Sequence, residues 1–446
     1  MMSDGHQLCL WLGTRIVAEI GYWPTEEQWK LRYVQDWLSD PEGFPLSPAL
    51  PLQQDISAGA VRRFVENLLP EGRALDIVAS SQGIARSNVF GMIRALGSET
   101  TGAFRFLPAG VDGAAEQQPQ TLREISLAEL DERIAERDRR PLIEWDGRIR
   151  MSVAGYQDKL LVYCDGRPEH GARLFLPDFP LASTHILKPE PADARMPHMV
   201  ANEHFCMTLA ATLGLPVAQV AILRTPRPIL AVTRFDRAIA GATVERRHII
   251  DACQASDLPV SFKYERNIGS AGEAALYRDG MSLPRLFQIL QHVNRKTVDK
   301  LAMLRWVLFQ FVIGNSDAHG KNFSFYVHPA GLQATPWYDL VSVVQYPQFS
   351  HALAMAFGDE FNLDEVKAFA LADFAQRCDI DRQLLLRESR RLRDGVHKHA
   401  LALAKSGPYE NAERDMADAI ATYAIAQATR LADSAKEATT ISVEML

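Results

Sequence analysis

The chain has 446 residues, of which 47% are hydrophobic and 23% charged, a composition typical of a globular enzyme built from two or three packed units. Its formal net charge of −7 disfavours a free-standing nucleic-acid binder, because affinity for phosphate backbones rests on a basic surface. No apolar run is long enough to span a membrane and no signal segment precedes the first elements, so a cytoplasmic protein without a membrane partner is expected. The five cysteines are scattered and form no CxxC pair, which argues against a disulfide framework or structural zinc.

The N-terminal part, residues 1–110, is predicted to form a subdomain of its own. Its expected elements are a hairpin at 8–20 around Gly13, helices at 56–69 and 74–96, and a second hairpin at 97–107. A stretch of low hydrophobicity at 109–119 then marks a boundary. Residues 111–145 are therefore predicted to be a linker with a charged connecting helix at 126–138.

The pattern changes from strands to helices near residue 247. Strands are expected at 149–151, 159–163, 185–188 and 229–235, with one amphipathic helix at 199–213. Long periodic helices are expected at 282–292, 297–313, 363–377, 382–404 and 413–436. The order predicts an α+β fold with a mixed sheet lobe at 146–246 and a helical lobe at 247–446. A cleft between two such lobes is where ligands usually bind.

The segment Asn315–Asn322, followed by Trp337-Tyr338-Asp339, carries the most chemical information. It supplies a carboxylate, an amide five residues later and a second carboxylate, which is the spacing of a phosphoryl-transfer site. Asp317 is the candidate base, and Asn322 with Asp339 are the candidate Mg²⁺ ligands, because Mg²⁺ prefers oxygen. The alternative is a polar turn between a helix at 301–313 and a strand near 323–327.

Further candidate parts precede this segment in the order that a kinase needs. The loop Ser152–Lys159 joins two predicted strands, and its small residues would let backbone N–H groups approach phosphates, although a simple strand turn has the same composition. Lys188 ends an apolar strand where a lysine that binds phosphate would lie, and Glu203 on the next helix is proposed to pair with it. The competing interpretation is that both side chains are solvated.

A candidate hinge ends the predicted sheet lobe. Thr233, Arg234 and Phe235 lie just before the change in composition, where a backbone segment could meet the edge of an adenine. Alternatively, Arg234, Asp236 and Arg237 form ion pairs on the connector.

These motifs agree with one known family in order and spacing over roughly residues 8 to 345. The matching segments are Pro45–Leu52, Asn67–Pro70, Ser152–Lys159, Thr184–Lys188, Asn202-Glu203, Arg234–Arg237, Asp251–Gln254, Leu258-Pro259, Lys263–Glu265, Asp317–Asn322 and Tyr338-Asp339. The chain resembles the HipA-type serine/threonine kinases, which are the toxin members of bacterial toxin–antitoxin pairs.

The resemblance implies a protein-kinase-like, two-lobed fold with an N-terminal accessory subdomain that binds ATP and Mg²⁺. It implies that Asp317 is the catalytic base and that Asn322 and Asp339 hold the metal. The implied ATP contacts are Ala154, Gly155, Tyr156, Gln157, Asp158, Lys159, Lys188, Thr233, Arg234, Phe235, His319, Gly320, Lys321, Asn322, Tyr338 and Asp339. Glu203, Asp251 and Gln254 would support the site.

In this family the loop serine, here Ser152, is phosphorylated by the kinase itself, and the modified loop leaves its ATP-binding position. The added charge of about −1.5 to −2 beside the phosphates of ATP gives a physical cause for that release.

The resemblance also implies partners. Family members phosphorylate aminoacyl-tRNA synthetases such as glutamyl-tRNA synthetase, which inhibits translation and leads to growth arrest and persistence. They are held by a HipB-type helix-turn-helix antitoxin, and operator DNA is bound mainly through that complex. A basic cluster near the C-terminus would contact DNA phosphates in that complex. The alternative is a solvated helix face, which the acidic residues Glu388 and Asp394 within the cluster favour. Its members are Arg387, Arg390, Arg391, Arg393, His397, Lys398 and His399.

Two departures from the family pattern affect the edge of the site. Ile250 precedes Asp251 where the family often has a second carboxylate, and Thr233 stands where glutamate is frequent. One alternative function is a catalytically silent nucleotide-binding co-repressor that acts with the antitoxin. Another is a metal-dependent phosphohydrolase that uses Asp317, His319 and Asp339 with water as the nucleophile.

Overall fold

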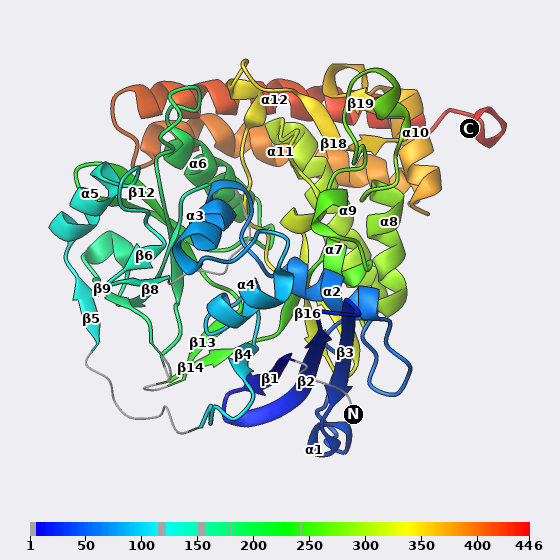
Figure 1. The fold of residues 1–446 in the computed structure, drawn as a ribbon. Coiled ribbons are helices and arrows are strands. Elements are labelled where there is room, and N and C mark those ends of the chain that lie inside the picture. Colours follow the sequence, from blue (N-terminus) through cyan, green and yellow to red (C-terminus); the bar gives the residue numbers. More distant parts are fainter. Residues whose placement is uncertain (1–5, 115–121, 150–156, 179–180, 241–242) are drawn as a thin grey trace. The chain divides into compact units, whose positions relative to one another are not determined.

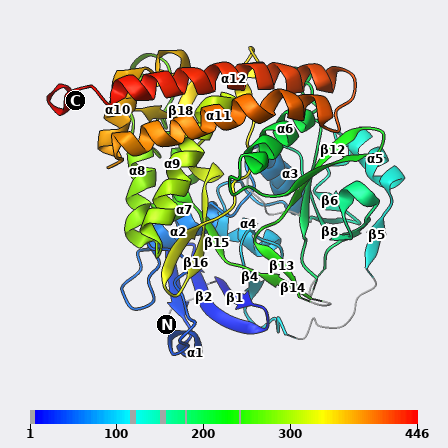
Figure 2. The same cartoon turned by 180° about the vertical axis from the view of Figure 1, so that it is seen from behind.

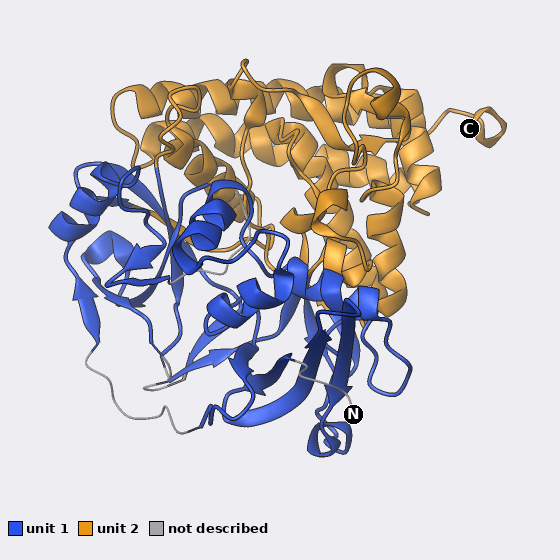
Figure 3. Cartoon of the chain, viewed as in Figure 1, with its two compact units in different colours: residues 1–189, 223–250, 325–332 blue, residues 190–222, 251–324, 333–446 orange. Residues whose placement is uncertain are grey.

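The computed structural model describes residues 6–114, 122–149, 157–178, 181–240 and 243–446 (Figure 1). The chain divides into two compact units, coloured separately in Figure 3. Unit 1 comprises residues 1–189, 223–250 and 325–332, and unit 2 comprises residues 190–222, 251–324 and 333–446. The chain passes between the units five times, at 189/190, 222/223, 250/251, 324/325 and 332/333, and all but the first of these crossings fall within short strands. The division into four segments that we expect from the sequence stays a prediction.

Unit 1 begins with an antiparallel four-stranded sheet in the order β3-β2-β1-β4. The strands are β1 His6–Leu12, β2 Arg15–Trp23, β3 Gln28–Tyr33 and β4 Arg105–Pro108. Between β3 and β4 in sequence lie the helices α1 Gln35–Leu38, α2 Ala58–Glu66, α3 Gly72–Gln82 and α4 Val89–Leu96. The hairpin at Gly13 is confirmed. The hairpin expected at 97–107 is wrong, because Leu107 and Phe106 pair across to β1 and no second strand forms in that segment.

A six-stranded sheet in the order β11-β12-β10-β8-β9-β5 follows. Its strands are β5 Arg123–Ile125, β8 Leu160–Asp165, β9 Arg173–Leu176, β10 His185–Pro189, β11 Val220–Arg224 and β12 Pro228–Thr233. Helix α5, Leu127–Ala135, shares a core with the sheet, because Leu130 and Ile134 pack with Leu160 and Leu187. Two small hairpins, β6 Glu144–Trp145 with β7 Arg148–Ile149 and β13 Arg237–Ala240 with β14 Thr243–Arg246, complete this part.

Unit 2 is mainly helical. Its helices are α6 Met199–Thr212, α7 Ala252–Ala255, α8 Leu283–Gln288, α9 Lys296–Ile313, α10 Ala368–Arg377, α11 Arg382–Ser406 and α12 Ala412–Ala438. The long helices α11 and α12 run side by side in both views (Figures 1 and 2). Buried Ala417, Ala421, Ala424 and Ala428 recur every three or four residues on α12, so one face of small side chains lets its neighbours approach closely.

Short elements complete the chain. A three-stranded sheet contains β15 Ile249–Asp251, β16 Ser324–His328 and β17 Gly331–Ala334, and a hairpin contains β18 Ala352–Phe357 and β19 Glu360–Asn362. The 3-10 helices are η1 Pro168–His170, η2 Val260–Phe262, η3 Gly272–Leu276, η4 Ile289–His292, η5 Gly320–Asn322, η6 Val343–Gln345, η7 Leu363–Glu365 and η8 Val443–Met445. The α+β class predicted from the sequence is confirmed, and the helical part carries the β18–β19 hairpin in addition.

The cysteines are free thiols: Cys9 is half-buried and the other four are buried, as the absence of paired spacing led us to expect. Among the described residues, the helices are all too short or too polar to cross a lipid bilayer.

Candidate active site

The loop that carries Asp317 begins where α9 ends. Gly314 has φ +67 and ends the helix in the left-handed conformation, and a Cβ there would lie 2.6 Å from a methyl of Val344. Asn315 follows, with its amide nitrogen 2.8 Å from the side-chain oxygen of Gln310. Its side-chain oxygen accepts the backbone N–H of Asp317 at 3.1 Å. The position of Asp317 is therefore fixed by the end of the helix.

Asp317 is the exposed member of an otherwise buried segment. Of residues 311–325, all of which the structure describes, Asp317 alone is exposed. The hydroxyl of Tyr264 donates a hydrogen bond to its Oδ1 at 2.7 Å. The carboxylate is therefore both oriented by the protein and accessible to a ligand, as a general base must be.

Asn322 and Asp339 lie in contact beside this loop. The backbone N–H of His319 donates to Asn322 Oδ1 at 3.1 Å, and Asn322 Nδ2 lies 3.4 Å from Asp339 Oδ2. Asp339 has φ +53, a left-handed conformation that costs a non-glycine residue of order 1–3 kcal/mol and that clusters at functional sites. The two proposed metal ligands are thus brought together although they are 17 residues apart in sequence.

His319 has a structural task in this loop. Its Nδ1 accepts the backbone N–H of Lys321 at 3.3 Å, and together with Asn322 it forms a capping box around η5. Burial, with the nearby charges of Lys263 and Lys321, lowers the pKa of His319 to about 3. The imidazole is consequently neutral at pH 7 and can accept this bond.

The supporting residues predicted at 251 and 254 connect to the loop through Lys321. The Lys321 ammonium lies 2.6 Å from Asp251 Oδ2, and both side chains are largely buried. Asp251 also caps α7 by accepting the N–H of Gln254 at 2.8 Å, and Gln254 Oε1 accepts the N–H of Asp251 in return. The hydroxyl of Tyr338 donates to the carbonyl of Lys321 at 2.7 Å. Burial raises the pKa of Tyr338, so this hydroxyl keeps its proton.

Close packing around position 320 explains why the loop has a glycine there. A Cβ on Gly320 would lie 2.8 Å from both Cys253 Sγ and Met281 Cγ, distances that real Cβ atoms do not show. Its N–H donates to the carbonyl of Lys263 at 3.0 Å. The close approach of these segments therefore requires glycine.

The predicted ATP-binding residues of unit 1 lie on or beside the six-stranded sheet. Lys188 is buried on β10, where it pairs with Leu230 of β12. Thr233 ends β12, and its hydroxyl lies 3.2 Å from His185 Nε2. Lys159 is buried just before β8, and Gln157 donates to the carbonyl of Pro189 at 3.4 Å.

The other proposed residues of the phosphate loop are only partly covered by the structure. Asp158 lies 3.6 Å from the Arg137 guanidinium. Ser152, Ala154, Gly155 and Tyr156 lie outside the described residues.

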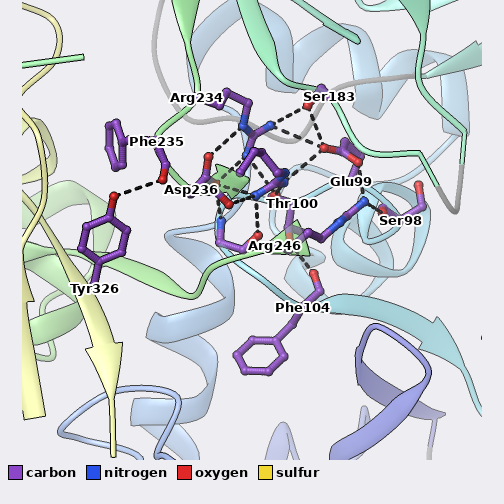
Figure 4. A network of polar contacts seen from close by, with 12 residues as sticks. Ser98, Glu99, Thr100, Phe104, Ser183, Arg234, Phe235, Asp236, Arg246 and Tyr326 are labelled. Carbon is purple, nitrogen blue, oxygen red and sulfur yellow. Dashed lines mark hydrogen bonds and ion pairs between the residues drawn. The ribbon is translucent and has the colours of Figure 1, made fainter. Parts of the chain in front are cut away.

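The hinge segment shows ion pairing of the kind weighed as its alternative. Figure 4 shows the Arg234 guanidinium between Asp236, at 2.7 Å, and Glu99, at 3.4 Å. The carbonyl of Phe235 accepts the Tyr326 hydroxyl at 3.0 Å. The Arg234 side chain therefore has a structural role, and an adenine contact by the backbone stays a prediction.

Glu203 is buried within unit 2 on α6. Its pairing with Lys188 stays a prediction, since Lys188 belongs to unit 1.

Sequence reasoning missed the contacts of three residues that shape the loop. Tyr264 contacts Asp317, Asn315 holds the Asp317 backbone, and the carbonyl of Lys263 holds Gly320. The segment Lys263–Glu265 stood among the matching motifs, but no chemical argument assigned it a role. Tyr264 lies 53 residues from Asp317 in sequence, so a local pattern cannot predict their contact.

The oxygen atoms of Asn322 and Asp339 fit a hard divalent cation. Carboxylate and amide oxygens are the ligands that Mg²⁺ prefers, and it usually keeps several waters besides one or two protein groups. Asn322 Nδ2 lies 3.4 Å from Asp339 Oδ2, so the two side chains lie next to each other, while Asn322 Oδ1 accepts the backbone N–H of His319. Among the described residues these are therefore suitable holders of the metal that a phosphoryl-transfer site needs.

Comparisons with known proteins show the family. The HipA-like C-terminal domain matches residues 151–404, and the HipA N-terminal domain matches residues 8–107. The serine/threonine-protein kinase toxin HipA of Shewanella oneidensis is 40% identical over 379 residues, covering 84% of each chain. The Y4mE protein of Sinorhizobium fredii is 35% identical over 374 residues, covering 82% of this chain and 84% of that protein.

A solved structure shows the same fold. A chain in the complex of HipA, HipB and operator DNA from Shewanella oneidensis matches with a TM-score of 0.87 and 36% identity. The match covers 98% of this chain and 100% of that one. The resemblance seen in the motifs is confirmed, and the chain belongs to the HipA family of kinase toxins.

Proposed function

We propose that this chain is an ATP-dependent serine/threonine protein kinase that transfers the γ-phosphate of ATP to a serine of a protein substrate. The observation that carries the proposal is the arrangement around Asp317. One exposed carboxylate is held by Tyr264, and next to the same loop an amide and a second carboxylate meet at Asn322 and Asp339. This arrangement lies within the region that matches the HipA-like C-terminal domain.

Each group has a defined task in phosphoryl transfer. Asp317 accepts or orients the proton of the attacking serine hydroxyl. Asn322 and Asp339 would hold Mg²⁺, which when bound neutralises charge on the phosphate oxygens. Lys321 and Tyr338 keep the loop in place through Asp251 and the Lys321 carbonyl.

The remaining nucleotide contacts rest on the family resemblance. Lys188, Gln157–Lys159 and Thr233–Phe235 would contact ATP, together with Ala154, Gly155 and Tyr156 of the preceding loop. Ser152 in that loop is proposed to be the site of self-phosphorylation. Glu203 is proposed to support Lys188 by ion pairing.

The biological role follows the same resemblance. The proposed substrate is an aminoacyl-tRNA synthetase such as glutamyl-tRNA synthetase, whose phosphorylation would inhibit translation and cause growth arrest and persistence in the cytoplasm. The proposed partner is a HipB-type antitoxin that joins the chain to operator DNA. The support for this partner is the 36% identical chain in the solved complex of HipA, HipB and operator DNA.

The proposal is tested by incubating the purified chain with γ-labelled ATP and Mg²⁺. Label on Ser152, abolished in Asp317→Asn, supports the kinase. Free labelled phosphate without labelled protein would instead indicate the phosphohydrolase, and neither product would indicate the silent co-repressor. The matched control is Asp433→Asn, which neutralises an exposed carboxylate on α12 and should leave labelling unchanged.

The substrate is identified by phosphoproteomics after brief induction of the toxin in its native host. One dominant new phosphosite on an aminoacyl-tRNA synthetase, absent when Asp317→Asn is induced, would support the proposed target. A dominant site on a protein of another class would replace it.

A further inference from the structure

Tyr264 contacts the candidate base from a segment 53 residues earlier in the chain. Its hydroxyl donates to Asp317 Oδ1 at 2.7 Å, a length typical of a hydrogen bond to a carboxylate. We infer that Tyr264 is a positioning residue that orients Asp317 toward the hydroxyl of the substrate. The inference rests on the proposed kinase activity and adds a residue to its machinery.

The backbone holds Tyr264 and Asp317 in a fixed relation through β18. The N–H of Glu265 donates to the carbonyl of Ala354 at 2.9 Å, and the N–H of Ala354 donates to the carbonyl of Ser316 at 2.8 Å. Glu265 follows Tyr264 in sequence, and Ser316 precedes Asp317. A single residue of β18 therefore connects the tyrosine segment to the base segment.

Further contacts anchor the tyrosine segment on both sides. The carbonyl of Lys263 accepts the N–H of Gly320 at 3.0 Å, and the carboxylate of Glu265 accepts the N–H of Ala356 at 2.8 Å. Glu265 also forms an ion pair with Arg278. The Tyr264 ring stands edge-on to His319 with centroids 5.1 Å apart. The hydroxyl thus has a defined position to which the Asp317 side chain must adjust.

The exposure of Asp317 makes such a contact useful. The terminal torsion of an aspartate is broad, so an exposed carboxylate without a fixed partner samples many orientations. A hydrogen bond to Oδ1 narrows that distribution and favours one orientation of the carboxylate toward the substrate hydroxyl. Because proton acceptance requires a separation of about 2.6–3.2 Å, a small misplacement of the base lowers the rate of the chemical step.

Tyr264→Phe tests the inference, because it keeps the ring against His319 and removes only the hydroxyl. The measurements are the maximal rate of label incorporation into the chain at saturating MgATP, the ATP concentration that gives half that rate, and the melting temperature. We expect the maximal rate to fall about tenfold or more, as for loss of precise orientation of a catalytic group, with the other two values unchanged. The matched control is Tyr277→Phe. Tyr277 is 53% exposed, so this variant should behave like the wild type.

Two outcomes would overturn the inference. An unchanged or higher maximal rate in Tyr264→Phe would mean that the hydroxyl does not orient the base for catalysis. A lower melting temperature with a proportionate rise in the ATP concentration for half-maximal rate would mean that the residue only supports the fold. The kinase proposal itself fails separately, if the wild type incorporates no label or if Asp317→Asn incorporates as much as the wild type.

Discussion

Two polar networks, one in each unit, differ in what they leave exposed. The network around Glu99 in unit 1 contains Glu99, Asp236, Arg234, Arg237 and Arg246, whose side chains are all between 1% and 14% exposed (Figure 4). The network around Asp317 in unit 2 is less buried, because Asn315 is buried, Tyr264 is half-buried and the central carboxylate is exposed. The first is therefore a structural network, whereas the second presents the proposed base to solvent.

The charges of the Glu99 network compensate one another inside the fold. Burial would raise the pKa of Glu99, but the guanidinium groups of Arg246, Arg237 and Arg234 outweigh it and lower the pKa to about 2. Backbone groups complete the network, since Arg237 donates to the carbonyls of Thr100 and Gly102. A strongly shifted pKa thus marks a structural ion-pair network here, and burial of its charges separates it from the proposed site at Asp317.

The largest expected effect comes from Asp317→Asn. The rate of phosphoryl transfer should fall by about 10²- to 10⁴-fold, which is the range for loss of a general base. The free energy of unfolding should change by less than about 0.5 kcal/mol, because the side chain is exposed. Label incorporation and denaturant unfolding measure the two. A destabilisation of several kcal/mol would show that Asp317 is a structural residue like Glu99.

Glu99→Gln should, in contrast, cause a large loss of stability. The change leaves three guanidinium groups with the Asp236 carboxylate, and removal of one partner from a buried ion-pair network costs about 3–5 kcal/mol. Denaturant unfolding of Glu99→Gln and Asp317→Asn in parallel checks this. The control is Glu124→Gln, which removes an exposed pair with Arg173 and should cost less than about 1 kcal/mol. Equal losses of stability in Glu99→Gln and Glu124→Gln would contradict the structural role of the network.

The pH dependence of stability should also show that the charge of Glu99 stabilises the fold. A carboxylate whose pKa is lowered on folding stabilises the protein above its unfolded pKa, and that contribution is lost as the pH falls toward the folded pKa. The stability difference between wild type and Glu99→Gln should therefore be constant above pH 5 and shrink between about pH 4.5 and about pH 2. Urea unfolding across this range measures it. A difference that does not change with pH would mean that the Glu99 charge is not what stabilises the network.

Gly320→Ala should have an intermediate effect on stability and also lower activity. Its Cβ would force Cys253 and Met281 to move, and overpacking of this kind costs about 1–3 kcal/mol. Thermal unfolding and label incorporation measure the result. The matched control is Gly147→Ala, where nothing lies within 4 Å of a Cβ, although its φ of +71 adds strain of about 1 kcal/mol. A larger loss at Gly147 than at Gly320 would contradict close packing of the loop.

Arg246→Lys should have the smallest effect. The ammonium keeps the charge beside Glu99 but cannot also reach the carbonyl of Ser98, which Arg246 contacts at 3.4 Å. We expect a loss of about 1 kcal/mol with activity unchanged, measured by denaturant unfolding and label incorporation. A loss as large as that of Glu99→Gln would mean that the geometry of the fork, rather than the charge, holds the network.

Local patterns predicted the elements whose causes are local. The helix ending at Gly314 and the polar loop with Asp317 and Asn322 follow from periodicity, a glycine cap and spacing. The hairpin expected at 97–107 failed because β4 pairs with β1, about a hundred residues away, and local composition does not encode that choice. Similarly, Asp317 could be proposed as a base from its own segment, whereas its contact with Tyr264 could not be predicted.

The Glu99 network shows the same limit. Arg234, Asp236 and Arg237 were weighed as an ion-paired connector from their sequence alone. Glu99 lies 135 residues before Arg234 and gave no local signal, yet its carboxylate joins three guanidinium groups of this network. Long-range electrostatic partners of this kind are chosen by the tertiary fold.

The distribution of thiols gives a practical consequence. Cys9 lies on β1 between Glu19 of β2 and Leu107 of β4, and it is more accessible than Cys164, Cys206, Cys253 and Cys378. Maleimide reagents should thus attach first at this one natural position in the N-terminal sheet, and slowly at neutral pH, since burial and Glu19 raise the pKa of Cys9. A fluorophore attached there would lie far in sequence from the loop of Asp317, and no engineered cysteine would be needed.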